Sequence, residues 1–165
     1  MKLPNIKNVK GFTLIELLVV IGILAILLSI VLIAINPARQ FGQANNTRRR
    51  SEVTQILNAI GAYAADHKGL LPPALEAAAT DGTIYALASA DRGAVAHLDD
   101  CALLVPTYIP ALPQDPQQGT GTAITACGAA YDTGYNAKVT VNATVKRVTI
   151  SAPLAQNAET IDITR

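Results

Sequence analysis

The sequence predicts an α+β protein in which one long N-terminal α-helix packs on a small antiparallel β-sheet. An uncharged aliphatic run over residues 17–35 forms the first part of this helix. Apolar residues then recur at intervals of three and four over residues 53–64, which is typical of a helix with one buried face. The last third of the chain alternates apolar and polar residues, as half-buried strands do. These patterns predict an anchor followed by one small globular domain.

The aliphatic run is long enough to cross a membrane. Between Leu17 and Ile35 only Gly22 and Ser29 are not aliphatic, and no residue is charged. As a helix the run spans roughly 28 Å, close to the ~30 Å thickness of the hydrocarbon core. An ordinary secretory signal has a shorter apolar core of about 7–15 residues. We therefore expect the run to be retained as a transmembrane helix.

Helical periodicity continues beyond this run. One helix is expected from about Phe12 to His67, with Gly69 as a stop signal and its second half against the globular domain. Pro37 interrupts this helix and favours a kink, because proline removes one backbone hydrogen bond. The buried stripe of the second half is expected to comprise Val53, Ile56, Leu57, Ile60 and Tyr63 or Ala64.

The remaining sequence predicts short helices and then strands. Helical pieces are expected over residues 74–79 and 99–104, the second with Asp99 as its N-cap. Four prolines between residues 106 and 116 enforce an extended, turn-rich path. An antiparallel meander of three or more strands is expected, around residues 135–141, 148–152 and 161–163.

The junction between the short basic leader and the apolar run carries a distinctive group of residues. Gly11 and Phe12 follow Lys10, and Glu16 lies five residues beyond the glycine. A carboxylate at the mouth of an apolar helix is costly in lipid unless a positive group neutralises it. A chain cut after Gly11 would carry such a group, the amine of Phe12. Because this amine lies a turn away from Glu16 in its own helix, we expect Glu16 to pair with a neighbouring chain.

These residues resemble the N-terminal signal of bacterial type IV prepilins and type II secretion pseudopilins. Residues 63–72 and 108–116 also resemble segments of major pseudopilins and related pilins. The resemblance implies a pilin fold, cleavage after Gly11 by a prepilin peptidase, N-methylation of Phe12 and assembly through Glu16. It implies that the partners are identical subunits in a helical filament, the peptidase, an inner-membrane assembly platform and a motor.

The expected organisation has four parts and one membrane span. The leader is expected in the cytoplasm and the globular domain outside, with the chain passing from membrane lipid into a periplasmic or extracellular filament. The positive charges alone do not fix this orientation, because Lys2, Lys7 and Lys10 precede the span and Arg48 to Arg50 follow it. The orientation therefore rests on the resemblance. The parts are a leader (1–11), a transmembrane and assembly helix (12–36), an amphipathic helix (37–68) and a globular domain (69–165).

The expected function is that of a structural filament subunit. The alternative is a membrane-tethered minor pilin or periplasmic module, such as a DNA-uptake or adhesion component, that does not form the bulk filament. A type IV pilus, a secretion pseudopilus and a competence fibre all remain open. No glycine-rich phosphate loop, nucleophile elbow or H-E-x-x-H helix occurs, so no enzymatic activity is expected.

Arg48, Arg49 and Arg50 form the main basic cluster. Successive helical positions point around about 200°, so the three cannot form one groove-reading face. We expect a solvated or headgroup-facing collar, or pairing with carboxylates of neighbouring subunits. The alternative is DNA capture, since a filament multiplies weak phosphate contacts. Without the leader, ten basic residues face twelve acidic ones, which does not suggest a general nucleic-acid binder.

Two cysteines and two aspartates are candidate site residues in the globular domain. Cys101 and Cys127 match no metal-binding spacing. In an exported domain we expect them to form a disulfide worth roughly 3.5 kcal/mol, the alternative being two buried thiols. Asp115 and Asp132 are weak calcium candidates, because loop aspartates bind calcium in the major pseudopilins that the chain resembles. No compact acidic loop supports calcium, and we expect no metal or other cofactor.

Overall fold

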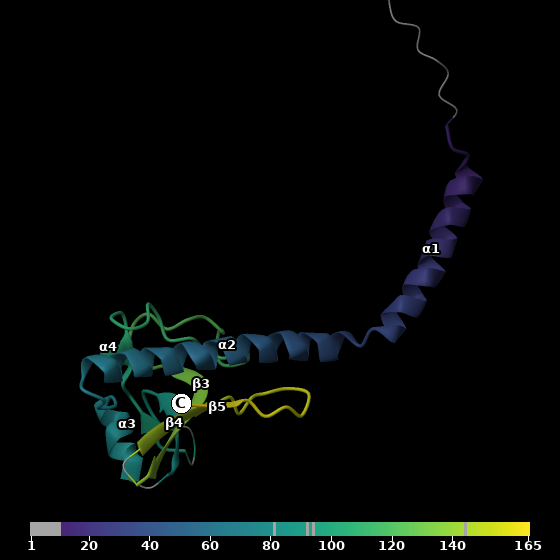
Figure 1. Ribbon diagram of the computed structural model, residues 1–165. Coiled ribbons are helices and arrows are strands. Elements are labelled where there is room, and N and C mark those ends of the chain that lie inside the picture. The colour runs from purple at the N-terminus through teal and green to yellow at the C-terminus, as the bar shows by residue number, and fades with distance from the viewer. Residues whose placement is uncertain (1–10, 81, 92, 94, 144) are drawn as a thin grey trace, which may run out of the picture. The chain divides into compact units, whose positions relative to one another are not determined.

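The computed structural model describes residues 11–80, 82–91, 93, 95–143 and 145–165 (Figure 1). Residues 1–10, with the three leader lysines, lie outside this part of the chain. The chain divides into two compact units, with the boundary between Gln40 and Phe41. The elements are α1 (Leu14–Ala34), α2 (Pro37–Asp66), α3 (Pro73–Ala77), the 3-10 helix η1 (Ala78–Thr80), β1 (Ile84–Ala88), β2 (His97–Leu98), α4 (Cys101–Leu104), β3 (Asp132–Asn142), β4 (Val145–Ser151) and β5 (Asp162–Thr164).

The first unit consists mainly of α1, which is apolar on every side. Its 21 residues are long and apolar enough to cross a membrane, and none of them is buried. The hydroxyl of Ser29 donates to the carbonyl of Ala25 at 2.8 Å, so this polar group is satisfied within the helix. A helix that is apolar all round is stable in lipid or among other apolar helices.

The predicted long helix is present, with a break at Ile35 and Asn36. Ile35 is extended (φ −94°, ψ 105°), and α2 begins at Pro37. The side chain of Asn36 caps α2 by accepting from the backbone N–H of Arg39 at 3.2 Å. Proline suits the first position of a helix, where no N–H is needed, and disfavours helical backbone in the residue before it. The predicted interruption at Pro37 is therefore confirmed.

The second unit contains a five-stranded sheet in the order β2-β1-β3-β4-β5. Strands β3, β4 and β5 form the predicted antiparallel meander, in which Val139 pairs with Val148 and Ile150 with Ile163. Sequence alternation does not predict the other two strands. β1 adds antiparallel to β3, and β2 adds parallel to β1. The sheet is therefore mostly antiparallel, and the fold class is α+β as predicted.

The core lies between α2 and one face of this sheet, which α2 crosses in Figure 1. Val53 and Ile56 of α2 are at most 1% exposed, and Val139 and Ile150 of the strands are fully buried. Burying an aliphatic side chain of this size contributes about 1.5–3 kcal/mol. The predicted stripe on the second half of the long helix is therefore confirmed.

The short helix α4 differs from its prediction at its first residue. It begins at Cys101, so that Asp100 occupies the N-cap position without making a side-chain cap bond. Asp99 lies one residue earlier, although its Oδ1 accepts from the N–H of Cys101 at 3.3 Å. The carboxylate of Asp100 instead accepts from the N–H groups of Ala74 and Leu75, at 3.1 Å each, and so caps α3 from a distance in sequence. Burial raises the pKa of Asp100.

Candidate functional site

Thr13 and Glu16 form a capping box at the start of α1. Thr13 Oγ1 accepts from the N–H of Glu16 at 3.3 Å. Glu16 Oε2 accepts from the N–H and the hydroxyl of Thr13, at 2.8 and 2.7 Å. This arrangement satisfies two backbone N–H groups that have no partner in the first turn of a helix. Local sequence therefore fixes the start of the helix at Leu14.

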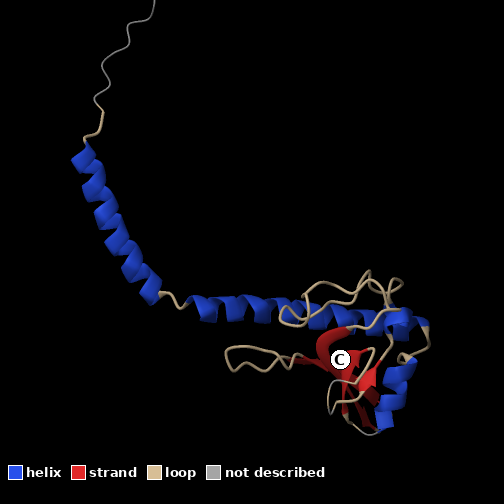
Figure 2. Cartoon of the chain, turned by 180° about the vertical axis from the view of Figure 1, so that it is seen from behind, coloured by secondary structure: helices blue, strands red, loops and turns tan. Residues whose placement is uncertain are grey.

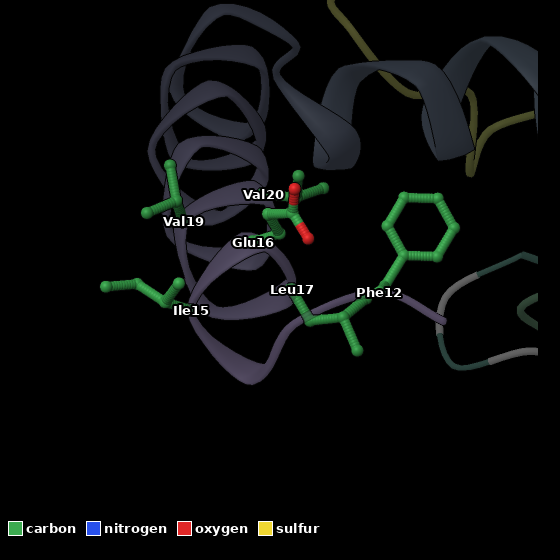
Figure 3. Close-up of a pocket in the computed structure, with 6 residues that line it drawn as sticks. All are labelled: Phe12, Ile15, Glu16, Leu17, Val19 and Val20. Atoms are coloured by element: carbon green, nitrogen blue, oxygen red, sulfur yellow. The ribbon is translucent and has the colours of Figure 1, made fainter. Parts of the chain in front are cut away.

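The capping box also bends the Glu16 side chain back toward the start of the chain. The nitrogen of Thr13, which directly follows Phe12, is 2.8 Å from the carboxylate. The carboxylate reaches back to Thr13 because the glutamate of a capping box points toward the N-cap. Pairing of Glu16 with the Phe12 amine of a neighbouring chain stays a prediction. Figure 3 shows the carboxylate in a groove that Phe12 and Val20 also line.

Gly11 and Phe12 are accessible. Phe12 is 83% exposed, and a Cβ added at Gly11 would meet no atom within 4 Å. The backbone of Gly11 also has no positive φ that would require glycine. The fold itself therefore tolerates a side chain at position 11. A requirement for glycine here would come from a molecule that acts on the chain.

The three arginines of the basic cluster bind three different parts of the second unit. Arg48 donates to Glu52 at 2.6 Å and to the carbonyl of Gly121 at 2.8 Å. Arg50 donates to Glu159 at 2.6 Å. Arg49 is fully buried. Arg49 is therefore not part of the expected solvated collar, whereas the side chains of Arg48 and Arg50 are 48% and 51% exposed and pair within the chain. Pairing with neighbouring subunits and DNA capture stay untested.

Arg49 lies at the centre of a buried polar cluster. Its Nε and Nη2 donate to the two carboxylate oxygens of Asp115 at 2.6 and 2.9 Å. The side chains of both residues are 0% exposed. Nη2 also donates to Gln117 at 2.8 Å, and Nη1 donates to Asn46 at 2.9 Å. A buried ion pair is tolerated when such further hydrogen bonds satisfy the remaining donors and acceptors.

Two further residues extend the cluster along α2. The side chain of Asn46 pairs with the backbone of Gln156, accepting from its N–H at 2.9 Å and donating to its carbonyl at 2.8 Å. On the other side of Arg49, Glu52 accepts a short hydrogen bond from the hydroxyl of Tyr135. Burial and the neighbouring Glu52 carboxylate raise the pKa of Tyr135.

The sequence contains a signal for this cluster that the hydrophobic pattern does not show. Gly42, Asn46, Arg49 and Glu52 continue the spacing of the buried stripe toward the N-terminal end of α2, and all four are buried. Because three of them are polar, a search for apolar periodicity ends at Val53. Periodicity extended to polar residues would have included them.

Asp115 does not fit a calcium ion, and the two oxygens of Asp132 already accept from protein donors. Both oxygens of Asp115 accept from the cationic Arg49, whereas those of Asp132 accept from the N–H of Gly134 at 2.9 Å and from Gln118 at 2.8 Å. Calcium takes six to eight oxygen ligands, and Arg49 would repel it. Within the described ranges, no three His, Cys, Asp or Glu side chains gather closely enough to hold a metal.

Cys101 and Cys127 are joined by a disulfide, with their Cα atoms 5.5 Å apart. Cys101 is 1% exposed and belongs to the core cluster, against which Cys127 packs. The segment that the bond closes contains Asp115. The disulfide therefore ties both ends of this segment to the core.

Comparison with known proteins identifies one part of the chain. The family model of the prokaryotic N-terminal methylation motif matches residues 6–32. This range contains Gly11, Phe12, the capping box and most of α1. No curated protein and no solved structure matches the chain. The N-terminal part of this protein therefore carries the methylation motif that forms the class III signal of type IV pilins and pseudopilins.

Proposed function

We propose that this protein is a structural subunit of a type IV pilus-like or pseudopilus filament. The observation that carries the proposal is the capping box of Thr13 and Glu16, directly after Phe12, at the start of α1. This helix is apolar on all sides and has no buried residue. Such a helix is stable in lipid and among other apolar helices. The precursor is held in the inner membrane by α1 and then packs this helix among those of identical subunits.

Processing precedes assembly. A prepilin peptidase cleaves after Gly11 on the cytoplasmic side and methylates the new amine of Phe12. Two observations support this step: the peptide bond is accessible, and the fold places no demand for glycine at position 11. The disulfide supports an oxidising location for the second unit, outside the cytoplasm.

Glu16 has two successive roles in this proposal. Before assembly its carboxylate accepts from the N–H and the hydroxyl of Thr13 in the capping box, which lowers the cost of this charge in lipid. During assembly the amine of a neighbouring subunit becomes its partner. An inner-membrane platform and motor, which the chain does not supply, extract the subunit from lipid.

The experiment compares Glu16→Gln with Glu16→Ala, by measuring the yield of sheared filaments beside the protein content of the membrane fraction. Glutamine keeps the capping box but removes the charge. If the charge matters, both variants enter the membrane and neither forms filaments, because an unpaired charge in an apolar bundle costs on the order of several kcal/mol. Normal filaments from Glu16→Gln would show that Glu16 serves only to cap the helix and that its charge is not needed for assembly.

Two further outcomes separate the proposal from its alternative. Intact-mass measurement of Gly11→Val should show a retained leader, and the wild-type chain should begin at a methylated Phe12. If the wild-type chain is processed and abundant but no filament is recovered, the protein is a membrane-tethered minor component.

A further inference from the structure

Two loops of the second unit meet at the buried part of α2. Figure 2 draws them in tan on either side of this helix. One contains Asp115 and Gln117 and is followed by β3, and the other contains Gln156 and joins β4 to β5. Backbone bonds hold part of each loop, such as that from the N–H of Asp115 to the carbonyl of Thr133 at 2.8 Å and that from the N–H of Ala152 to the carbonyl of Ile161 at 2.9 Å. Side chains of α2 add further bonds to both loops.

The guanidinium of Arg49 binds the first loop directly. Four of its five N–H donors are used, two for the carboxylate of Asp115, one for Gln117 and one for Asn46, at 2.6 to 2.9 Å. Asp115 Oδ1 also accepts from the backbone N–H of Gln117 at 2.8 Å, which fixes the turn. Gly134 allows β3 to approach this turn, because a Cβ there would lie 2.7 Å from that of Asp115.

The same guanidinium reaches the second loop through Asn46. The Oδ1 of Asn46 accepts from both Arg49 and the N–H of Gln156. Its amide group donates back to the carbonyl of Gln156 at 2.8 Å. One cation therefore connects oxygens from α2 and the first loop and, through Asn46, fixes a peptide of the second loop.

We propose that the Arg49 guanidinium is a built-in cation that orders both loops, so that this part of the protein needs no calcium ion at Asp115. A bound metal ion can do the same work, by drawing carboxylate and amide oxygens of separate segments together. Arg49 is covalently attached, and its single charge balances that of Asp115. A divalent cation added beside it would leave two uncompensated charges in a buried site.

The first test measures thermal unfolding of the full chain in detergent micelles, by circular dichroism. Samples contain either about 5 mM calcium chloride, above the affinity range of weak extracellular sites, or an excess of EDTA. The melting temperatures are expected to agree within about 1 °C, since a ligand that does not bind cannot shift them. A saturable calcium-dependent rise of more than about 3 °C would overturn the proposal.

The second test measures hydrogen exchange by mass spectrometry in peptides covering residues 113–121 and 152–160. Arg49→Lys keeps the charge but loses the planar fork, so exchange should rise about tenfold or more in both peptides. Arg50→Lys is the matched control. The Arg50 side chain pairs with Glu159 of the second loop, so this variant should affect only the 152–160 peptide. A rise confined to one peptide in Arg49→Lys would contradict the proposal.

A third variant keeps the test decisive if Arg49→Lys unfolds the whole chain. Asn46→Leu breaks the connection to Gln156 and leaves the Arg49–Asp115 pair in place. Exchange should rise in the 152–160 peptide and stay low in the 113–121 peptide. Equal protection of both peptides would show that Asn46 does not connect the second loop to Arg49.

Discussion

The two halves of α2 bury one continuous stripe but hold it by different means. From Val53 to Tyr63 the buried residues are apolar, whereas from Gly42 to Glu52 they are mainly polar. The apolar half packs on the sheet through contacts that have no direction, so several residues of similar volume would serve. The polar half depends on particular partners at hydrogen-bonding distance, and losing one partner leaves a buried group unsatisfied. The free energy of unfolding should therefore depend mainly on the chemical identity of the side chains in the polar half, and mainly on their volume in the apolar half.

The largest effect is expected for Arg49→Met. This change leaves the carboxylate of Asp115 buried without its cation, which costs about 3–5 kcal/mol. Denaturant unfolding of the full chain in detergent micelles measures the loss. The double variant Arg49→Met/Asp115→Leu should recover most of it, because an apolar pair can replace a buried ion pair. If the single variant loses less than about 1 kcal/mol, the polar half does not depend on this pair.

Ile56→Ala is the corresponding test of the apolar half. Ile56 is 1% exposed, so truncation should cost about 2–4 kcal/mol through lost burial and a residual cavity. Ile56→Val, the volume control, should cost only about 0.5–1.5 kcal/mol in the same unfolding measurement. Equal losses for both variants would mean that volume does not govern this half.

Tyr135→Phe should have a smaller effect, and again in the polar half. The ring stays buried, but Glu52 loses the hydroxyl that donates to it, at a cost of about 1–3 kcal/mol. Tyr131→Phe is the control, since the hydroxyl of this half-buried tyrosine donates at 2.7 Å to Asp99, which is exposed. The unfolding free energies of the two variants should differ clearly. Equal values would mean that burial of the Glu52 bond adds nothing.

Arg50→Ala should have the smallest effect, although it lies next to Arg49. The Arg50 side chain is 51% exposed, and its pair with Glu159 is worth less than about 1 kcal/mol. That loss should shrink further in high salt, because exposed ion pairs are screened. A loss as large as that of Arg49→Met would remove the distinction between buried and exposed members of the cluster.

Local sequence determined the elements whose signals lie within one turn or one strand. Thr13 and Glu16 set the start of α1, and Pro37 with Asn36 sets the break before α2. The stripe beginning at Val53 and the alternation in β3 and β4 follow from repeats of 3.6 and 2 residues. These signals can be read from sequence because each element carries its own capping residues or its own apolar face.

Only the tertiary structure decided how the polar residues are used. Asp115 is a loop aspartate in the sequence and becomes the partner of Arg49, sixty-six positions away, once α2 lies on the sheet. Strands β1 and β2 have weak alternation of their own. β1 exists because β3 offers an edge to pair with, and β2 pairs in turn with the free edge of β1. A polar group reveals its role only through the partner that satisfies it, and the fold brings that partner from a distant part of the chain.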